Sequence, residues 1–212
     1  NIYKKYKLEE ANEFLKKASD ILRKLDYKDQ HPDISYRLAN FNFMIGNFNE
    51  SQKLLNQCID LSKLQNNDSY FAHCTYHYGI QSIYNQDYQK AIKSFSITDS
   101  LYKQLYTSYD KSDSLYYNTL IQLCNYQIAI HNKEINIDDE ILKYIADYYE
   151  DFDYEDLYTF YILTKQKSLL MDAYLLLNDF IETLDKNQIT GFISLYYPKM
   201  IINEYTKLNS NP

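Results

Sequence analysis

Glycine and proline are scarce in this chain, which has only three of each in 212 residues. Average proteins contain roughly 7% glycine and 5% proline. Hairpin turns and phosphate-binding loops depend on residues that adopt positive φ, chiefly glycine. Gly46, Gly79 and Gly191 stand far apart in the sequence, so they cannot form a glycine-rich phosphate loop. The scarcity argues against a β-rich or nucleotide-binding fold and favours an all-helical one.

Long apolar runs are also missing, and no stretch approaches the roughly 18 residues that a transmembrane helix requires. The chain begins with Asn1 and Ile2, without an initiator methionine or the apolar core of a signal peptide. We therefore expect a fragment or a processed product that has no membrane span of its own. The sequence does not distinguish a cytoplasmic from a periplasmic location.

Cysteine is rare, and Cys58, Cys74 and Cys124 are scattered singly along the chain. An odd count argues against a framework of disulfides. Small, weakly polar cysteine side chains are among the residues most often found in protein interiors. We therefore interpret all three as small core residues.

Positive charge is limited, because the chain has 22 Lys and Arg against 29 Asp and Glu, a net charge of −7. The imbalance lies in the second half: residues 1–106 carry +2 and residues 107–212 carry −9. Neutralisation of phosphates by basic side chains supplies most of the affinity for nucleic acid. An acidic chain with two arginines is therefore not expected to bind nucleic acid.

Aromatic residues are abundant, with 25 Tyr and 10 Phe, and a hydrophobic content of 45% is sufficient for a folded core. Many tyrosines occupy apolar positions of the helical pattern, and we expect these in the core. Others can line a binding groove, because tyrosine offers a large rigid surface with one polar group. The tyrosines expected in the core are Tyr78, Tyr84, Tyr88, Tyr116 and Tyr174.

The first half of the chain repeats with a period of 40 residues. Ala11, Ser51 and Ala91 are small residues in one register, and Leu15, Leu55 and Phe95 are bulky apolar residues in the same register. Within each unit, apolar residues recur with the i, i+3, i+4, i+7 spacing of a helix. Breaks fall at 46–47 and 85–87, where Gly46 and Asn85 are candidates for left-handed helix ends and Asn47 and Asp87 for N-caps.

These repeats resemble the tetratricopeptide family. Small residues stand 12 positions apart in both units, at Ala39 and Ser51 and at Gly79 and Ala91, where two helices would approach closely. Armadillo and HEAT repeats have similar periods, but this pairing favours tetratricopeptide repeats. The period of 40 differs from the usual 34, and the resemblance covers about half the chain. The residues that carry it are Leu38, Ala39, Gly46, Phe48, Ser51, Leu55, Cys58, Gly79, Tyr88, Ala91 and Phe95.

The resemblance implies an α-solenoid of stacked antiparallel helical hairpins, forming a right-handed superhelix. Residues 1–106 would hold an incomplete first repeat and two clear ones, and residues 107–212 degenerate or capping hairpins of the same solenoid. A separate domain that begins near Ser108 is the alternative. Helices are expected over 114–130, 138–149, 157–177 and 180–184, with a last helix after Gly191 that contains Pro198 or begins near it.

No pattern in the sequence indicates catalysis, a cofactor or a metal. His73 and His77 stand one helical turn apart, but the zinc motif requires a glutamate after the first histidine and a third ligand. The acidic segment 151–156 lacks the glycine and the terminal glutamate of a calcium loop, and we interpret it as a solvated turn. No nucleophile elbow is present. We therefore expect a non-enzymatic protein without cofactors.

By analogy with the family, the concave face would bind a protein or peptide partner. The residues expected on this face lack the basic clamp with which some members of the family bind an acidic C-terminus. We expect a sensory or scaffold part of a larger bacterial regulator; alternatives are a self-associating module, such as a homodimer, and, less favoured, an enzyme. The candidate binding residues are Asp33, Tyr36, Asn40, Phe43, Met44, His73, Tyr76, Ile80, Ile83 and Tyr84.

Overall fold

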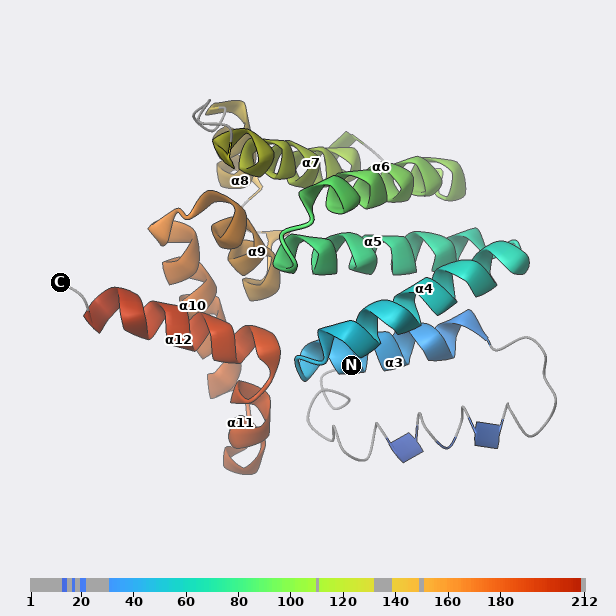
Figure 1. The fold of residues 1–212 in the computed structure, drawn as a ribbon. Helices are drawn as coiled ribbons and strands as arrows, with labels where there is room; N and C mark the ends of the chain where they lie inside the picture. Colours follow the sequence, from blue (N-terminus) through green and yellow to red (C-terminus); the bar gives the residue numbers. More distant parts are fainter. Residues whose placement is uncertain are drawn as a thin grey trace. The chain divides into compact units, whose positions relative to one another are not determined.

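The computed structural model describes residues 13, 14, 17, 20, 21, 31–109, 111–131, 139–148 and 151–210. These residues form helices and connecting turns without any β-strand, which confirms the prediction of an all-helical protein. No helix among them is long and apolar enough to cross a membrane. The helices, labelled in Figure 1, are α3 (Pro32–Met44), α4 (Phe48–Leu64), α5 (Asp68–Tyr84), α6 (Tyr88–Leu105), α7 (Lys111–His131), α8 (Asp139–Asp147), α9 (Tyr154–Thr164), α10 (Lys167–Glu182), α11 (Lys186–Ile193) and α12 (Tyr196–Ser210).

The chain divides into two compact units, Asn1–Cys124 and Asn125–Pro212, so that the boundary falls inside α7. The first unit contains α3 to α6, in which each helix packs against the next one along the chain, and α3 also contacts α5. Of the residues expected to form an incomplete first repeat, Ala11 and Leu15 lie outside the described residues.

The three turns that connect α3 to α6 share one geometry. Each contains one residue of positive φ, and these residues, Gly46, Asn66 and Gln86, stand 20 positions apart. In the first turn the Gly46 N–H donates to the Phe43 carbonyl at 2.9 Å and the Asn47 N–H donates to the Asn42 carbonyl at 2.7 Å. The other two turns repeat these bonds, which define the Schellman helix end. The 40-residue sequence repeat therefore consists of two helix-and-turn units of 20 residues each.

The left-handed residue before α6 differs from the predicted one. Asn85 has φ −84° and ends α5 as its C-cap, whereas Gln86 adopts φ 59°. Gln86 follows Gly46 by 40 residues, so the repeat register locates this turn better than the left-handed preference of asparagine does. Asp87 and Asn47 occupy the N-cap positions as predicted, and the Asp87 side chain accepts a hydrogen bond from the Lys90 N–H at 3.3 Å.

Small residues mark the contacts between neighbouring helices in the first unit. Ala39 and Ser51 are fully buried, and the Ser51 hydroxyl donates to the Ala39 carbonyl at 2.6 Å. Gln81 on α5 donates from its side-chain amide to the same hydroxyl. Gly79 lies against the buried ring of Phe95, and a Cβ added there would stand 2.7 Å from one ring carbon.

The other repeat positions differ in how far they are buried. Leu55, Cys58, Ala91 and Phe95 are fully buried, whereas Gly46 is exposed at its turn. Leu38, Phe48 and Tyr88 are half-buried. The residues that pack between helices are therefore the small residues and the bulky apolar residues that follow them in the repeat.

Replacement of Gly79 by alanine should lower the free energy of unfolding by about 1–2 kcal/mol. The new methyl group would overlap the Phe95 ring, and overpacking in a core typically costs about 1–3 kcal/mol, partly offset by the higher helix propensity of alanine. Gly191, in α11, is the matched control because an added Cβ meets no atom within 4 Å. Urea denaturation should show a lower free energy of unfolding for G79A and a higher one for G191A, each relative to wild type. Equal changes in the two variants would contradict the contact between Gly79 and Phe95.

Cys58 on α4 and Cys74 on α5 form a disulfide, with their Cα atoms 6.3 Å apart. All three cysteines are buried as predicted, but the interpretation of all three as unpaired core residues is wrong. The odd count misled because Cys124 remains a free thiol while the other two pair. The disulfide joins two consecutive helices across their connecting turn, within the core formed by Ala39 and Leu55.

Reduction of this disulfide should lower the free energy of unfolding by about 3 kcal/mol, because it removes the constraint on a loop of 16 residues in the unfolded chain. Thiol labelling of the denatured protein, followed by mass spectrometry, checks the pairing. One labelled thiol is expected without reductant and three after reduction. Three labelled thiols without reductant would contradict the disulfide.

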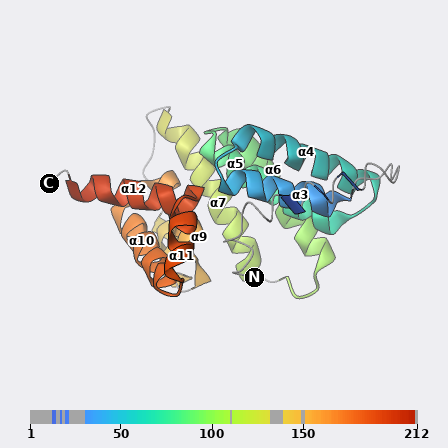
Figure 2. The same cartoon turned by 90° about the horizontal axis from the view of Figure 1, so that it is seen from below.

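In the second unit, α9 packs along α10, and α12 contacts both of these helices as well as α11 (Figure 2). The expected helix over 157–177 with a break at 178–179 is wrong. The chain breaks at Lys165, which has φ 59° and donates its N–H to the Tyr161 carbonyl at 2.7 Å, while 178–179 lie within α10. A lysine carries no preference for the left-handed conformation, so composition does not mark this turn.

The core of the second unit lies where α9, α10 and α12 meet. Leu157 and Phe160 on α9, Leu177 on α10 and Ile201 on α12 are fully buried. Pro198 stands in the first turn of α12, where its missing N–H removes no helical hydrogen bond, as the sequence predicts. The helices expected over 114–130 and 138–149 correspond to α7 and α8.

Candidate functional site

The residues predicted to line a concave groove lie in two different environments. Ile83 is fully buried and Phe43 and Ile80 nearly so, which makes these three core residues and not an accessible surface. The half-buried residues are Asp33, Tyr36, Asn40, Met44, His73, Tyr76 and Tyr84.

Asp33, predicted as a contact residue, is engaged within α3. Both of its carboxylate oxygens accept hydrogen bonds from the Arg37 Nε, at 2.8 and 2.9 Å. Burial acts to raise the pKa of Asp33, but hydrogen bonds from Arg37 and Tyr70 outweigh it and hold the pKa below its usual value. This carboxylate is therefore ionised and paired at neutral pH.

Aromatic rings from α3 and α5 form a continuous cluster that contains Tyr36, Tyr76 and both histidines of α5. The Tyr36 ring lies edge-on to His73 and to His77, with centroids 6.0 and 5.3 Å apart. The Tyr36 hydroxyl and His77 Nε2 form a hydrogen bond at 3.0 Å. Burial raises the pKa of Tyr36 above its ordinary value and lowers that of His77 to about 4, so both groups are uncharged at neutral pH. His73 instead bonds through Nδ1 to the Ser69 carbonyl at 2.7 Å.

The two histidines are therefore engaged separately and do not converge on a common point. Their partners are a phenol for His77 and a backbone carbonyl for His73. In the described part of the chain, no group of three or more His, Cys, Asp or Glu side chains is placed to hold a metal ion. Within the acidic segment, Asp153 caps α9 by accepting bonds from the Glu155 and Asp156 N–H groups.

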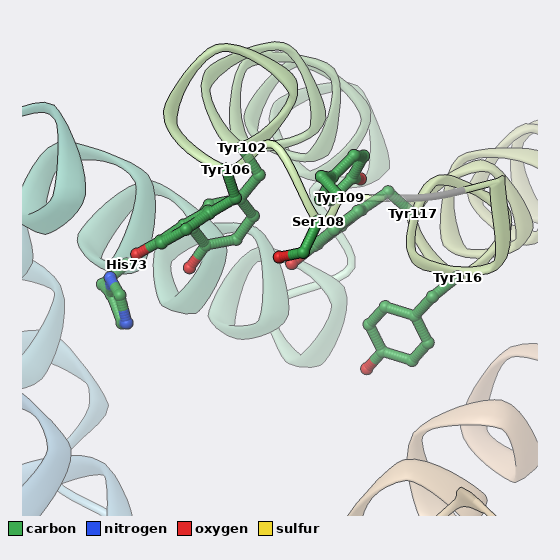
Figure 3. A pocket seen from close by; sticks show the side chains of 7 residues that line it. All are labelled: His73, Tyr102, Tyr106, Ser108, Tyr109, Tyr116 and Tyr117. Atoms are coloured by element: carbon green, nitrogen blue, oxygen red, sulfur yellow. The ribbon is translucent and has the colours of Figure 1, made fainter.

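A pocket of about 350 Å³ continues from this cluster toward α6 and α7. Figure 3 shows Tyr102 and Tyr106 extending their hydroxyl ends toward the side on which His73 lies. The Tyr102 ring is perpendicular to His73 at a centroid distance of 5.8 Å and inclined by 47° to Tyr106 at 5.6 Å. The lining residues are His73, Tyr102, Tyr106, Ser108, Tyr109, Tyr116 and Tyr117.

The pocket forms where the regular succession of turns ends. Position 106 follows Gln86 by the same 20-residue step, but Tyr106 is extended, with φ −120° and ψ 117°. The chain therefore leaves α6 through a longer connection that carries Tyr106, Ser108 and Tyr109 to the pocket. The interruption of the repeat thus supplies three of the seven lining residues.

Hydrogen bonds hold two of the tyrosines in the pocket wall. Tyr109 donates its hydroxyl hydrogen to Asp99 Oδ1 at 2.6 Å, and the hydroxyls of Tyr76 and Tyr116 bond to each other at 2.9 Å. The second carboxylate oxygen of Asp99 accepts a bond from Lys103 at 2.6 Å. Burial acts to raise the pKa of Asp99, but its hydrogen bonds outweigh this and lower it, so the carboxylate is ionised at neutral pH.

Tyr102 stands at the centre of the pocket wall, in contact with four other aromatic rings. Burial raises its pKa to about 12, with smaller contributions from Tyr106 and Tyr36. The phenol is therefore neutral over the whole physiological range. At Tyr102 the pocket wall offers an uncharged aromatic ring and a hydroxyl group.

Sequence reasoning identified His73 and missed the other lining residues. Tyr102, Tyr106 and Tyr109 follow the i, i+4, i+7 spacing of a helical face, but α6 ends at Leu105 and only Tyr102 lies in it. Tyr116 was expected in the core, but it is half-buried and lines the pocket. The extended conformation at Tyr106 has no marker in the sequence, because any residue adopts it.

Comparisons of the chain with protein-family models, with curated proteins and with solved structures found no match. The geometry of the site is therefore the basis for any statement about its function.

Protonation of His77 should destabilise the protein as the pH falls from about 6.5 to about 4. The folded pKa, lowered by burial and then by the proximity of His73, lies below the unfolded value, so the unfolded chain binds more protons in this range. The full stabilisation is present above pH 6.5, and up to about 3 kcal/mol is lost by pH 4.

Urea denaturation at several pH values measures this loss. The H77Q variant keeps an acceptor for Tyr36 and cannot be protonated, so its free energy of unfolding should change less over this range. H73Q is the matched control, and its free energy of unfolding should still fall over this pH range by most of the wild-type amount. An identical pH dependence in wild type and H77Q would contradict the assignment.

Proposed function

We propose that the chain is a non-enzymatic interaction module whose first unit binds a segment of a partner protein at the tyrosine-lined pocket. The supporting observation is the pocket itself, with five tyrosines around about 350 Å³. Tyrosine is favoured at binding surfaces because it combines large contact area, few rotatable bonds and a polar end. This volume falls in the range of pockets that accommodate small molecules or single side chains.

We further propose that the helices form tetratricopeptide-like hairpins stacked in a solenoid, in the sensory or scaffold part of a larger bacterial regulator. Support comes from the turns repeated at 20-residue steps and from the close contacts at Ser51 and Gly79. In such an arrangement, the aromatic cluster on α3 and α5 would extend the binding surface beyond the pocket.

Peptide selection on the intact chain tests the binding role. We expect a selected peptide to bind at least about tenfold more weakly to Y106A than to wild type, because buried aromatic anchors carry much of the binding energy. Tyr106 is 43% exposed in the free protein, so its removal should leave the fold intact. L175A removes an exposed apolar residue of α10 as a control and should bind normally. Equal binding by all three proteins would contradict the proposal.

Self-association is a second candidate function, favoured by two exposed apolar residues one turn apart on α10. Met171 is 47% and Leu175 is 56% exposed. Apolar surface of this kind is typical of contacts between protein chains. Light scattering that finds a strict monomer at micromolar concentrations would exclude this candidate.

A further inference from the structure

The lining of the tyrosine pocket has no positively charged amine or guanidinium group among the described residues. It consists of five phenols, the Ser108 hydroxyl and His73. The His73 Nδ1 is bonded to the Ser69 carbonyl at 2.7 Å. Nothing in this lining resembles the clusters of lysine and arginine that bind carboxylates or phosphates.

The rings that surround the pocket are inclined to one another and do not form one flat platform. Tyr102 makes angles of 90° with His73, 47° with Tyr106 and 42° with Tyr117. A planar ligand is best bound by parallel rings. Rings inclined in this way can approach a compact cation from several directions, and the negative face of an aromatic π-system attracts such a cation.

An ion pair lies beside the pocket wall, with its carboxylate bonded to one of the lining tyrosines. Asp99 is ionised and accepts the hydroxyl hydrogen of Tyr109, which increases the electron density of that ring. Lys103 pairs with the other carboxylate oxygen, so the attraction for a cation comes chiefly from the rings and not from a net negative charge. An anion in the pocket would find no lysine or arginine among the lining residues.

We propose that the tyrosine pocket binds an organic ammonium group by cation–π contacts, with Tyr102 and Tyr106 as its principal aromatic surfaces. The group could belong to a lysine side chain of a bound segment or to a small free amine, since both present the same chemistry. The inference rests on the proposed binding role of this pocket and adds the chemical class of what enters it.

Choline and its uncharged isostere 3,3-dimethylbutan-1-ol provide the test. Both are titrated into the intact protein labelled with ¹³C in its tyrosine rings, at constant ionic strength, and followed by NMR. Choline should bind at least about fivefold more tightly than the neutral alcohol, as expected for a cation–π contact of ordinary strength. Equal affinity, or no binding of choline, would overturn the proposal.

Variants of Tyr106 locate the binding. Y106L keeps apolar bulk but removes the π face, so choline affinity should fall about fivefold, whereas Y106F keeps the ring and should bind like wild type. Y174L is the matched control, because Tyr174 stacks on Tyr205 in the second unit and does not line the pocket. Circular dichroism confirms that each variant is folded. Unchanged choline binding by Y106L would overturn the assigned site.

The selected peptides distinguish a lysine side chain from a free amine as the source of the ammonium group. They also distinguish failure of the cation proposal from failure of the binding role. If a lysine supplies the group, replacing it by norleucine should weaken peptide binding about fivefold, and choline should compete with the peptide. Choline binding without such competition assigns the site to a free amine. Peptide binding that depends on Tyr106 but is indifferent to lysine and choline would overturn the cation proposal and leave the binding role standing.

Discussion

Close approach of neighbouring helices at small residues is the constraint on which the first unit depends. Ser51 bonds to the backbone of α3 at Ala39, and Gly79 allows the Phe95 ring to lie directly against α5. These contacts pack helices of 13 to 18 residues against one another, with a turn every 20 residues. The Schellman turns then need only three residues to reverse the chain. The disulfide between α4 and α5 reinforces the same packing.

The tyrosine pocket is a consequence of where this regularity ends. Through α5 the turns leave little room between helices, and the rings of α3 and α5 pack against each other. After α6 the extended residue Tyr106 lengthens the connection, and the rings of Tyr102 and Tyr117 meet around a volume that no side chain of the described residues fills. The binding role proposed for the protein therefore depends on a departure from the repeat.

The sequence predicted the helical fold and the repeat register, because hydrophobic periodicity and small-residue spacing are local signals. It predicted the break at 85–87 but not Gln86 as its left-handed residue, and it did not predict the turn at Lys165; neither glutamine nor lysine has a left-handed preference. Pairing of Cys58 with Cys74 also escaped prediction, because it depends on which faces of two helices meet. Of the seven lining residues only His73 was predicted, from the repeat register, whereas Tyr106 reaches the pocket through a backbone conformation without a sequence marker.

The position of the pocket has a consequence for how such a chain can change in length. All seven lining residues come from α5, α6, the connection after α6 and the start of α7. The regular turns lie on the N-terminal side of this segment. A gene could therefore gain or lose a 40-residue unit equivalent to α3 and α4 without removing a single residue of the pocket lining. The number of helical units can thus change while the pocket lining stays the same.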